Sequence, residues 1–588
     1  MTRTPTAADR RGDEGFALML VLFILLAVGL VAMGSAMLIG SSQMMGGYEK
    51  QQALLESAAD AGLEETRARI NGDPTIYPDS GYRTLESAVQ VRDASGAVIP
   101  GVTRTTYAGP TGVATGQYGV FGSIVVVSQD ASRHRVIRRG DIAQESFAKF
   151  AYFTNDESNI VFGGGDQIQG PVHSNDVITI HSTGATFRGP GGVTTAQTIS
   201  GVGNGRFYEG YTERVAAIAM PTTADLTKLR TYATRGGTAF TAPTGGNPND
   251  TRMRIEFVAV DVNGDGRVTG ADEGFFKVYQ SNNAAWLMAQ KPSGTATLTA
   301  SNYCGNYNAG GVFLPASSYV TNAARLAALQ SPTRRCLLGG SDDLNGGFQA
   351  NDGTGQWVAR PFAWANMPPA IAARADAAYL YPLSHTYNPN FKGVIHVTGR
   401  VGVSGVVRGR VTLASTDDIF ILDDITYANA PGVGNCSEID MLGLFSGGDL
   451  LVADNTLNSP TIPQGGNNPY WDYDDSKNSV TIHGVLLTLG SFSAESYNQG
   501  ATASESCEGT PWGRGCLYMA GGVIQGTRGA VGQADGHGFL KRYSYDACAR
   551  VAPPPYFPTT GRFSRGRYYE LNPVGFDVAA YLDRITAG

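Results

Sequence analysis

The most specific chemical pattern in the chain is a run of oxygen-bearing residues and glycines at residues 261–273, DVNGDGRVTGADE. Counted from the first aspartate, oxygen ligands fall at positions one, three, five and twelve, and a glycine stands at position six, where a calcium-binding loop turns sharply. Because Ca²⁺ prefers six to eight hard oxygen ligands, the pattern predicts a structural calcium ion. The predicted ligands are Asp261, Asn263, Asp265, the backbone carbonyl of Arg267, Thr269 and Asp272.

This loop departs from the helix–loop–helix calcium motif in two respects. The twelfth position is Asp272 rather than glutamate, although Glu273 follows it. The flanking sequences, MRIEFVAV and GFFKVYQ, are typical of strands rather than helices. The alternative is a hairpin turn rich in Asn, Asp and Gly that binds no metal.

Other residues with catalytic chemistry do not form a recognisable enzyme motif. Carboxylates occur at Asp417–Asp418, Asp423–Asp424 and in WDYDD at 471–475, positions typical of solvated turns, and His173 in GPVHSN suits a turn better than a catalytic base. The sequence contains no GxSxG, HExxH or phosphate-binding loop. We therefore expect a non-enzymatic protein, with a polysaccharide-active enzyme as the least favoured alternative.

A candidate ligand patch lies near the C-terminus, in RFSRGRYYE at 562–570. Alternating cations and rings suit a ligand that is both charged and stackable, so DNA and surface glycans are candidate ligands. The 44 basic and 51 acidic residues of the whole chain give no strong overall field towards nucleic acid. The predicted patch consists of Arg562, Phe563, Arg565, Arg567 and Tyr568.

The six cysteines lie in the second half of the chain, and none is part of a CxxC pair, which argues against zinc. An even number in an exported protein favours disulfides, with 15 possible pairings. Proximity in the chain favours Cys507–Cys516 and Cys304–Cys336, which leaves Cys436–Cys548. The alternative is six buried free thiols.

An apolar run from Phe16 to Ile39 must carry the protein to or through a membrane. A helix of these 24 residues is about 36 Å long, enough for a hydrocarbon core of about 30 Å and longer than a secretory signal core. Arginines before the run place the N-terminus in the cytoplasm. A cleaved signal peptide ending at Gly34 is the alternative.

The helix signal does not stop at the end of this run. Residues 48–70 repeat small and apolar residues at helical spacing, namely Leu55, Ala58, Ala59, Gly62 and Leu63. We therefore expect one helix that continues from the membrane into an amphipathic stem.

Leader, Gly15–Phe16, apolar stretch and stem together resemble the N-termini of type IV pilins, most closely the PilX-like minor pilins and the K-type pseudopilins of type II secretion. The resemblance implies cleavage between Gly15 and Phe16 by prepilin peptidase, and methylation of the new N-terminus. Leu20 occupies the fifth mature position, where most pilins carry glutamate; its absence points to a minor or tip subunit.

The resemblance also implies partners and a location. The helix would rest in the inner membrane as a single span and then pack with other minor and major pilins in a fibre at the cell surface. The expected function is a minor pilin at or near the pilus tip that supports assembly and presents a large β domain. The alternatives are a tip adhesin or DNA-uptake receptor, and a type II secretion pseudopilin.

Beyond residue 70 the apolar pattern changes from helical to strand periodicity. Apolar pairs at 401/403, 411/413 and 419/421 recur at spacings of 10 and 8 residues, as a β-solenoid requires, with a β-sandwich as the alternative. Phrases such as GPVHSN and PPPYFP resemble an uncharacterised domain found behind PilX-like N-termini, which implies a β-solenoid inserted into a pilin fold.

The predicted fold class is therefore α+β and mostly β, with a long N-terminal pilin helix, a small antiparallel sheet and a large inserted β-solenoid. The predicted parts are a leader (1–15), a transmembrane and pilin helix (16–70), a pilin-type β region (71–146), a β-solenoid-like domain with the calcium-type loop (147–530) and a C-terminal region closing the β domain (531–588).

Overall fold

The computed structural model combines one long helix with extensive β structure, and it is therefore α+β and mostly β, as the sequence predicts. The residues it describes are 13–78, 80–111, 121–243, 252–281, 357–374, 376–431, 436, 440–452, 479–495, 497–498 and 505–587. They form two compact units. The first comprises the described parts of residues 1–113, 121–143 and 563–588, and the second those of 144–562.

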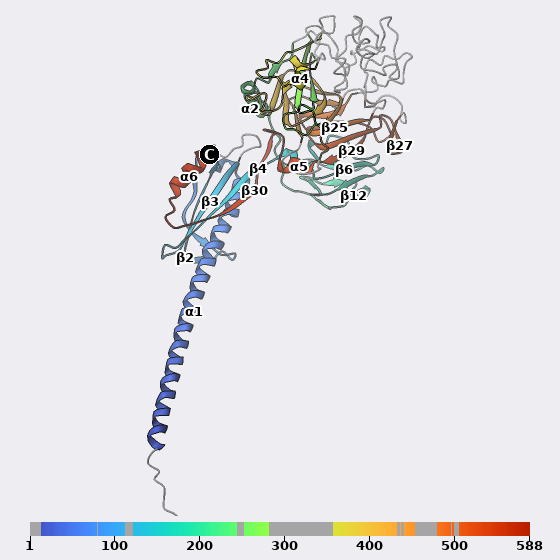
Figure 1. The fold of residues 1–588 in the computed structure, drawn as a ribbon. Helices are drawn as coiled ribbons and strands as arrows, with labels where there is room; N and C mark the ends of the chain where they lie inside the picture. Colours follow the sequence, from blue (N-terminus) through green and yellow to red (C-terminus); the bar gives the residue numbers. More distant parts are fainter. Residues whose placement is uncertain are drawn as a thin grey trace, which may run out of the picture. The chain divides into compact units, whose positions relative to one another are not determined.

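The first unit is a sheet with a helix on each face. Helix α1 (Asp13–Gly72) extends far beyond the strands of its own unit, as Figure 1 shows. The strands follow the order β1-β2-β3-β4-β30, and β1 to β4 are antiparallel neighbours. Their bounds are Arg83–Arg92, Val98–Pro110, Phe121–Gln129, Arg135–Ser146 and Thr559–Leu571, and the short helix η1 (Pro74–Ile76) precedes them.

The stem of α1 packs on this sheet with the side chains that its periodicity predicts. Leu55, Ala58, Ala59 and Leu63 are buried against the apolar face of the strands. Gly62 is required by close approach, since a Cβ there would lie 2.7 Å from Cδ of Arg104. On the opposite face, a second apolar cluster joins the sheet to α6 (Val578–Ala587).

The C-terminal region divides between the units, which differs from the prediction that residues 531–588 close the β domain. Residues from Phe563 onward belong to the first unit, where β30 lies beside β4. The side chain of Phe563 is buried in the cluster between α1 and the sheet, and its ring lies 4.9 Å from that of Tyr77. The second unit is thus inserted between two parts of the first.

The second unit begins with short strands and turns. Its first strands are β5 (Tyr152–Asp156), β6 (Asp166–Gln169), β7 (Val172–Ser174), β8 (Ile178–Thr179), β9 (Ala185–Arg188), β10 (Val193–Thr195), β11 (Ile199–Ser200), β12 (Gly205–Phe207) and β13 (Tyr211–Thr212). Its helices are η2 (Phe147–Lys149), η3 (Val202–Asn204), α2 (Thr223–Gly236), α4 (Pro369–Ala372), η6 (Ala377–Tyr379) and α5 (Ala547–Val551).

The strands after α2 are longer. They are β14 (Ala239–Thr241), β15 (Met253–Ala259), β16 (Gly274–Ser281), β17 (Trp357–Ala359), β18 (Tyr381–Pro382), β19 (Val394–Thr398), β20 (Val401–Val407), β21 (Arg410–Ser415), β22 (Ile419–Tyr427), β23 (Met441–Ser446), β24 (Leu450–Val452), β25 (Val480–Ala494), β26 (Glu505–Cys507), β27 (Thr510–Trp512), β28 (Cys516–Arg528) and β29 (Leu540–Tyr545).

Most pairings in this unit are parallel and join strands one repeat apart. Val401 pairs with Ile419, and Val403 with Ile421, a spacing of 18 residues. The same pattern continues through β19, β21, β23 and β25. The apolar pairs that the sequence singles out are fully buried in one large cluster that runs through the parallel strands.

The order of the strands in space differs from their order in the chain. Strand β28 pairs in parallel with β5, and β29 with β6, so the end of the unit stacks on its beginning. Helix α2 follows the first group of strands and leads to β14, which pairs with β19 of the second group. We call the junction of β28 and β29 with β5 and β6 the seam.

Candidate functional site

The N-terminal half of α1 is the largest exposed apolar surface among the described residues. Large apolar side chains from Phe16 to Met45 are more than half exposed. The one polar hydroxyl examined along this stretch, Ser41 Oγ, donates to the Leu38 carbonyl of the same helix at 3.0 Å, so it requires no outside partner. This segment is long and apolar enough to cross a membrane, which makes it a candidate anchor.

The predicted processing bond lies at the beginning of the same helix. Helix α1 begins at Asp13, so Gly15 and Phe16 are in its first turn, and residues 1–12 of the predicted leader are outside the described residues. The first backbone N–H groups of a helix lack intrahelical acceptors and the first turn frays readily. A peptidase can therefore reach this bond without unwinding the rest of α1.

Buried arginines fix the stem to the sheet. Arg104 pairs with Glu86 at 2.8 Å and with Glu65 of α1 at 2.5 Å. Arg138 approaches Glu56 at 3.5 Å and Asp60 at 3.8 Å, both on α1. These arginines are buried, so the ion pairs set the position of the helix on the sheet as well as contributing energy.

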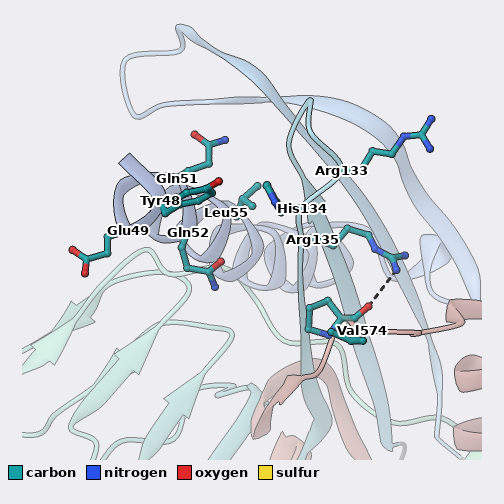
Figure 2. A pocket seen from close by; sticks show the side chains of 10 residues that line it. Tyr48, Glu49, Gln51, Gln52, Leu55, Arg133, His134, Arg135 and Val574 are labelled. Atoms are coloured by element: carbon teal, nitrogen blue, oxygen red, sulfur yellow. Dashed lines mark hydrogen bonds between the residues drawn. The ribbon is translucent and has the colours of Figure 1, made fainter. Parts of the chain in front are cut away.

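A pocket of about 550 Å³ lies beside the start of the stem, shown in Figure 2. Tyr48 and Leu55 of α1 face the turn between β3 and β4, which carries His134 and Arg135. His134 Nδ1 lies 3.0 Å from Asp130, and Arg135 donates to the carbonyl of Pro573 at 3.3 Å. The basic side chains of this turn therefore serve contacts within the unit.

The predicted calcium loop is a hairpin loop between β15 and β16, which pair as antiparallel strands. Asp261 accepts hydrogen bonds from the backbone N–H groups of Gly264 and Gly266 at 2.6 and 2.8 Å. Asn263 and Asp265 each accept from the N–H two residues further on. Both glycines have positive φ, of 78° and 77°. The first half of the loop is thus folded by its own side chains.

The second half of the loop does not bring every predicted ligand to the first. Glu273 is buried and accepts from the N–H groups of Val262 and Gly270, which closes the loop. Asp272 instead lies by the Tyr387 hydroxyl, and burial with this carboxylate raises the pKa of Tyr387. Over the described ranges, no three His, Cys, Asp or Glu side chains gather as a metal site.

Two further predicted ligands serve other contacts or offer only their backbone. The carbonyl of Thr269 accepts from Arg408, whose Nε also donates to Gly270 at 2.9 Å. Arg267 was predicted to contribute its carbonyl, and its N–H donates to Asp265 at 2.8 Å. The structure therefore keeps Asp261, Asn263 and Asp265 together and turns Asp272 away from them.

The predicted ligand patch requires a correction. Phe563 is 2% exposed within the core of the first unit, so its ring cannot stack on a ligand. Arg565 pairs with Glu64 at 2.7 Å, and Tyr568 donates to Asp60 at 2.8 Å. Burial, with the neighbouring Asp60 carboxylate, raises the pKa of Tyr568 to about 12.

The other two patch residues lie apart from this group in their contacts. Arg562 belongs to the second unit and donates to the carbonyls of Ala216 and Ala217 at 3.2 and 3.3 Å. Arg567 lies on the exposed part of β30. The sequence spacing therefore does not translate into one surface of alternating charges and rings.

Two disulfides are present, Cys436–Cys548 and Cys507–Cys516. Both are pairs that the sequence argument favours. Cys304 and Cys336, the third predicted pair, are outside the described residues. The short bridge closes the hairpin of β26 and β27, and the long one joins residues 112 positions apart.

Residues considered for catalysis have structural contacts. His173 is buried, its Nδ1 lies 2.9 Å from Thr194 Oγ1 and its Nε2 3.0 Å from Asn175 Oδ1, and burial lowers its pKa. Asp417 and Asp418 lie 3.7 and 3.0 Å from Arg400. The side chain of Asp423 and residues 471–475 are outside the described residues.

The seam contains a cluster of charges that sequence reasoning missed. Arg528 pairs with Glu157 at 2.8 Å, and Lys541 with Asp166 at 2.9 Å; each pair joins β28 or β29 to the first strands of the unit. Their separations of 371 and 375 residues leave no local spacing signal. Burial raises the pKa of Glu157 although Arg528 opposes the shift.

Comparison with known proteins adds one neighbour. No family model and no curated protein matches the chain. Among solved structures, the crystal structure of the competence-associated pilin ComZ from Thermus thermophilus is similar at 10% identity, over 87% of this chain and 96% of that one, with a TM-score of 0.21. So loose a superposition does not establish a shared fold, and the functional argument rests on the residues of this chain.

Proposed function

We propose that this chain is a non-enzymatic filament subunit, a PilX-like minor pilin placed at or near the tip of a type IV pilus. The observation that carries the proposal is the exposed apolar half of α1, which continues without a break into a stem packed on a small antiparallel sheet. Such a helix can rest in a membrane as one span, with a cytoplasmic N-terminus, and later pack against the helices of other pilins.

The size of the second unit supports a minor role. It is inserted between two parts of the first unit and includes most of the chain. A filament whose subunits repeat through closely packed helices has little room for an insertion of this size on every copy. Leu20, at the position where most pilins carry an acid, agrees with a subunit at the start or tip of a fibre.

We further propose that the second unit is a β-solenoid. The support is the parallel pairing of strands 18 residues apart and the continuous apolar cluster inside them. A β-sandwich would instead pack two antiparallel sheets face to face. In this arrangement each layer of strands buries the inner face of the next, and its end stacks on its beginning at the seam.

Processing by prepilin peptidase is the first test. In a cell that carries this enzyme, mass spectrometry of the mature chain should find methylated Phe16 as the N-terminus, because Gly15–Phe16 lies in the fraying first turn of α1. Sheared filaments should contain only a few copies per fibre. A chain that begins at Ser35 would mean that a signal peptide was removed. Copy numbers equal to those of a repeating subunit would contradict the tip location, and confinement to the cell envelope would favour a type II secretion pseudopilin.

We also propose that the hairpin loop binds structural calcium through Asp261, Asn263 and Asp265. Extracellular sites of this kind bind at about 10⁻⁴–10⁻³ M, so calcium at several times the dissociation constant should stabilise the protein by about 1 kcal/mol. Thermal unfolding of the full chain in detergent should therefore shift upward in calcium relative to EDTA.

The double variant Asp261→Ala with Asp265→Ala should lose this calcium-dependent increment. Asp93→Ala is the matched control, because Asp93 also accepts backbone N–H bonds in an exposed turn, at Ser95 and Ala97. The control should respond to calcium as the parent chain does. Equal melting temperatures of the parent chain in calcium and EDTA would refute the site.

A further inference from the structure

A pocket of about 290 Å³ lies at the seam, and we call it the seam pocket. Its apolar wall consists of Tyr497, Trp512 and Phe539. Trp512 ends strand β27 of the hairpin that the Cys507–Cys516 disulfide closes. Its ring rests on Gly164, where a Cβ would lie 2.7 Å from the ring and φ is 65°, so glycine is required. The ring is therefore held in position before any ligand arrives.

The polar side of the seam pocket has no net charge. Asp166 and Lys541 both line it, and they form a buried pair at 2.9 Å. Asn159 and Gln533 are exposed at its edge. The pocket thus offers an ion pair below and two amides, each able to donate and accept hydrogen bonds.

The backbone around the seam pocket is fixed by the same seam. Arg528 donates to the carbonyls of Ile160 and Val161 at 3.2 and 3.1 Å, which are pocket residues. The indole N–H of Trp512 is buried without a hydrogen-bond acceptor among the residues that the structure describes. Such a group is unfavourable unless an acceptor reaches it, and a ligand oxygen could supply one.

These features select one class of ligand. A nucleic acid requires an excess of positive charge, which the neutral Asp166–Lys541 pair does not provide. A purely apolar ligand would leave the ion pair and amides without partners. A sugar ring has an apolar face for Trp512 and hydroxyls for Asn159 and Gln533. The volume is near the lower end for ligand pockets, roughly 300 Å³, which suits one ring.

We propose that the seam pocket binds a single ring of a neutral glycan, with Trp512 as the stacking surface and Asn159 and Gln533 as hydrogen-bonding partners. The proposal goes beyond the role of α1 in a filament and does not depend on it. It assigns the second unit a recognition function at a site that differs from the patch at 562–568.

Binding can be measured on the full chain in a detergent that has no sugar headgroup. The probes are the methyl glycosides of glucose, galactose, mannose and N-acetylglucosamine, each followed by saturation-transfer NMR and by tryptophan fluorescence. At least one should bind at millimolar concentration, with its ring protons closest to the protein. A mixed-sequence single-stranded oligonucleotide should not displace it.

Two variants test the assignment. Asn159→Ala with Gln533→Ala removes exposed amides and should weaken binding by about fivefold for each hydrogen bond lost. Trp512→Phe keeps an aromatic ring on Gly164 and should weaken binding without unfolding the hairpin. Tyr208→Ala is the control, since Tyr208 is an exposed aromatic residue of the same unit outside the pocket.

The control should retain the affinity of the parent chain. The proposal is overturned if no glycoside binds at millimolar concentration. It is also overturned if glycoside binding survives in the Asn159 and Gln533 double variant, or if the oligonucleotide binds in the pocket and the glycosides do not.

Discussion

Replacement of Arg528 by methionine is expected to destabilise the second unit by about 3–5 kcal/mol, the usual cost of leaving a buried charge without its partner. Arg528 and Glu157 approach at 2.8 Å, and both side chains are 1% exposed. Methionine retains much of the side-chain length but cannot donate to the carboxylate. Thermal unfolding of the full chain in detergent, followed by the β-sheet signal in circular dichroism, measures the loss.

The location of the pair explains why the effect should be large. Arg528 ends β28, and Glu157 follows β5, its parallel neighbour at the seam. The guanidinium carbon also lies 3.8 Å from the centre of the Phe162 ring, and its nitrogens donate to the carbonyls of Ile160 and Val161. One side chain therefore holds both the charge and the backbone of the segment that the seam joins.

The same variant should acquire a particular pH dependence. Burial already raises the pKa of Glu157 above its ordinary value of 4.5, against the opposing effect of Arg528. Without Arg528, the folded state should hold a proton that the unfolded state loses above pH 4.5. Folded protein then binds more protons than unfolded protein, so stability should fall as pH rises above about 4.5, by at most about 1.4 kcal/mol per pH unit.

Two controls separate the ion pair from other effects. Glu157→Gln combined with Arg528→Met removes the unpaired charge, and it should recover part of the lost stability and lose the pH slope. Lys228→Met removes a surface pair with Asp225 whose lysine side chain is 73% exposed, and it should cost at most about 0.5 kcal/mol. A single variant at Arg528 that is no less stable than the double variant would contradict the argument.

The features that could be predicted from sequence depend on short-range periodicity. Leu55, Ala58, Ala59 and Leu63 recur at helical spacing, and the structure buries all four on the sheet. The apolar pairs from Val401 onward recur at strand spacing and become stacked, buried neighbours. In both cases one element and its adjacent repeat determine which side chains are buried.

The features that could not be predicted join distant parts of the chain. Strand β30 returns to the first unit from the far end of the sequence, and that return buries Phe563, which RFSRGRYYE presents as one ring among several cations. The partners at the seam are likewise hundreds of residues apart. Within the calcium-type loop, spacing identified Asp261 and Asp265, but the neighbouring Tyr387, far along the chain, draws Asp272 away.

Removal of the Cys436–Cys548 disulfide is expected to have the second large effect, a loss of up to about 4–5 kcal/mol. The bridge closes a loop of 112 residues, and the entropy that a crosslink removes from the unfolded chain increases with loop length. Cys548 is buried in the cluster beside α5, so alanine is the replacement that adds no buried polar group. The measurement is the thermal unfolding of Cys436→Ala with Cys548→Ala under oxidising conditions.

The second disulfide provides the matched control. Cys507→Ala with Cys516→Ala opens a loop of only 9 residues, for which the same argument predicts a loss of about 2–3 kcal/mol. Both double variants keep Cys304 and Cys336, so any contribution from those cysteines cancels in the comparison. The long bridge should therefore cost more stability than the short one. If the order is reversed, the stabilisation comes from local packing in the hairpin that carries Trp512, and the unfolded-chain argument fails for this protein.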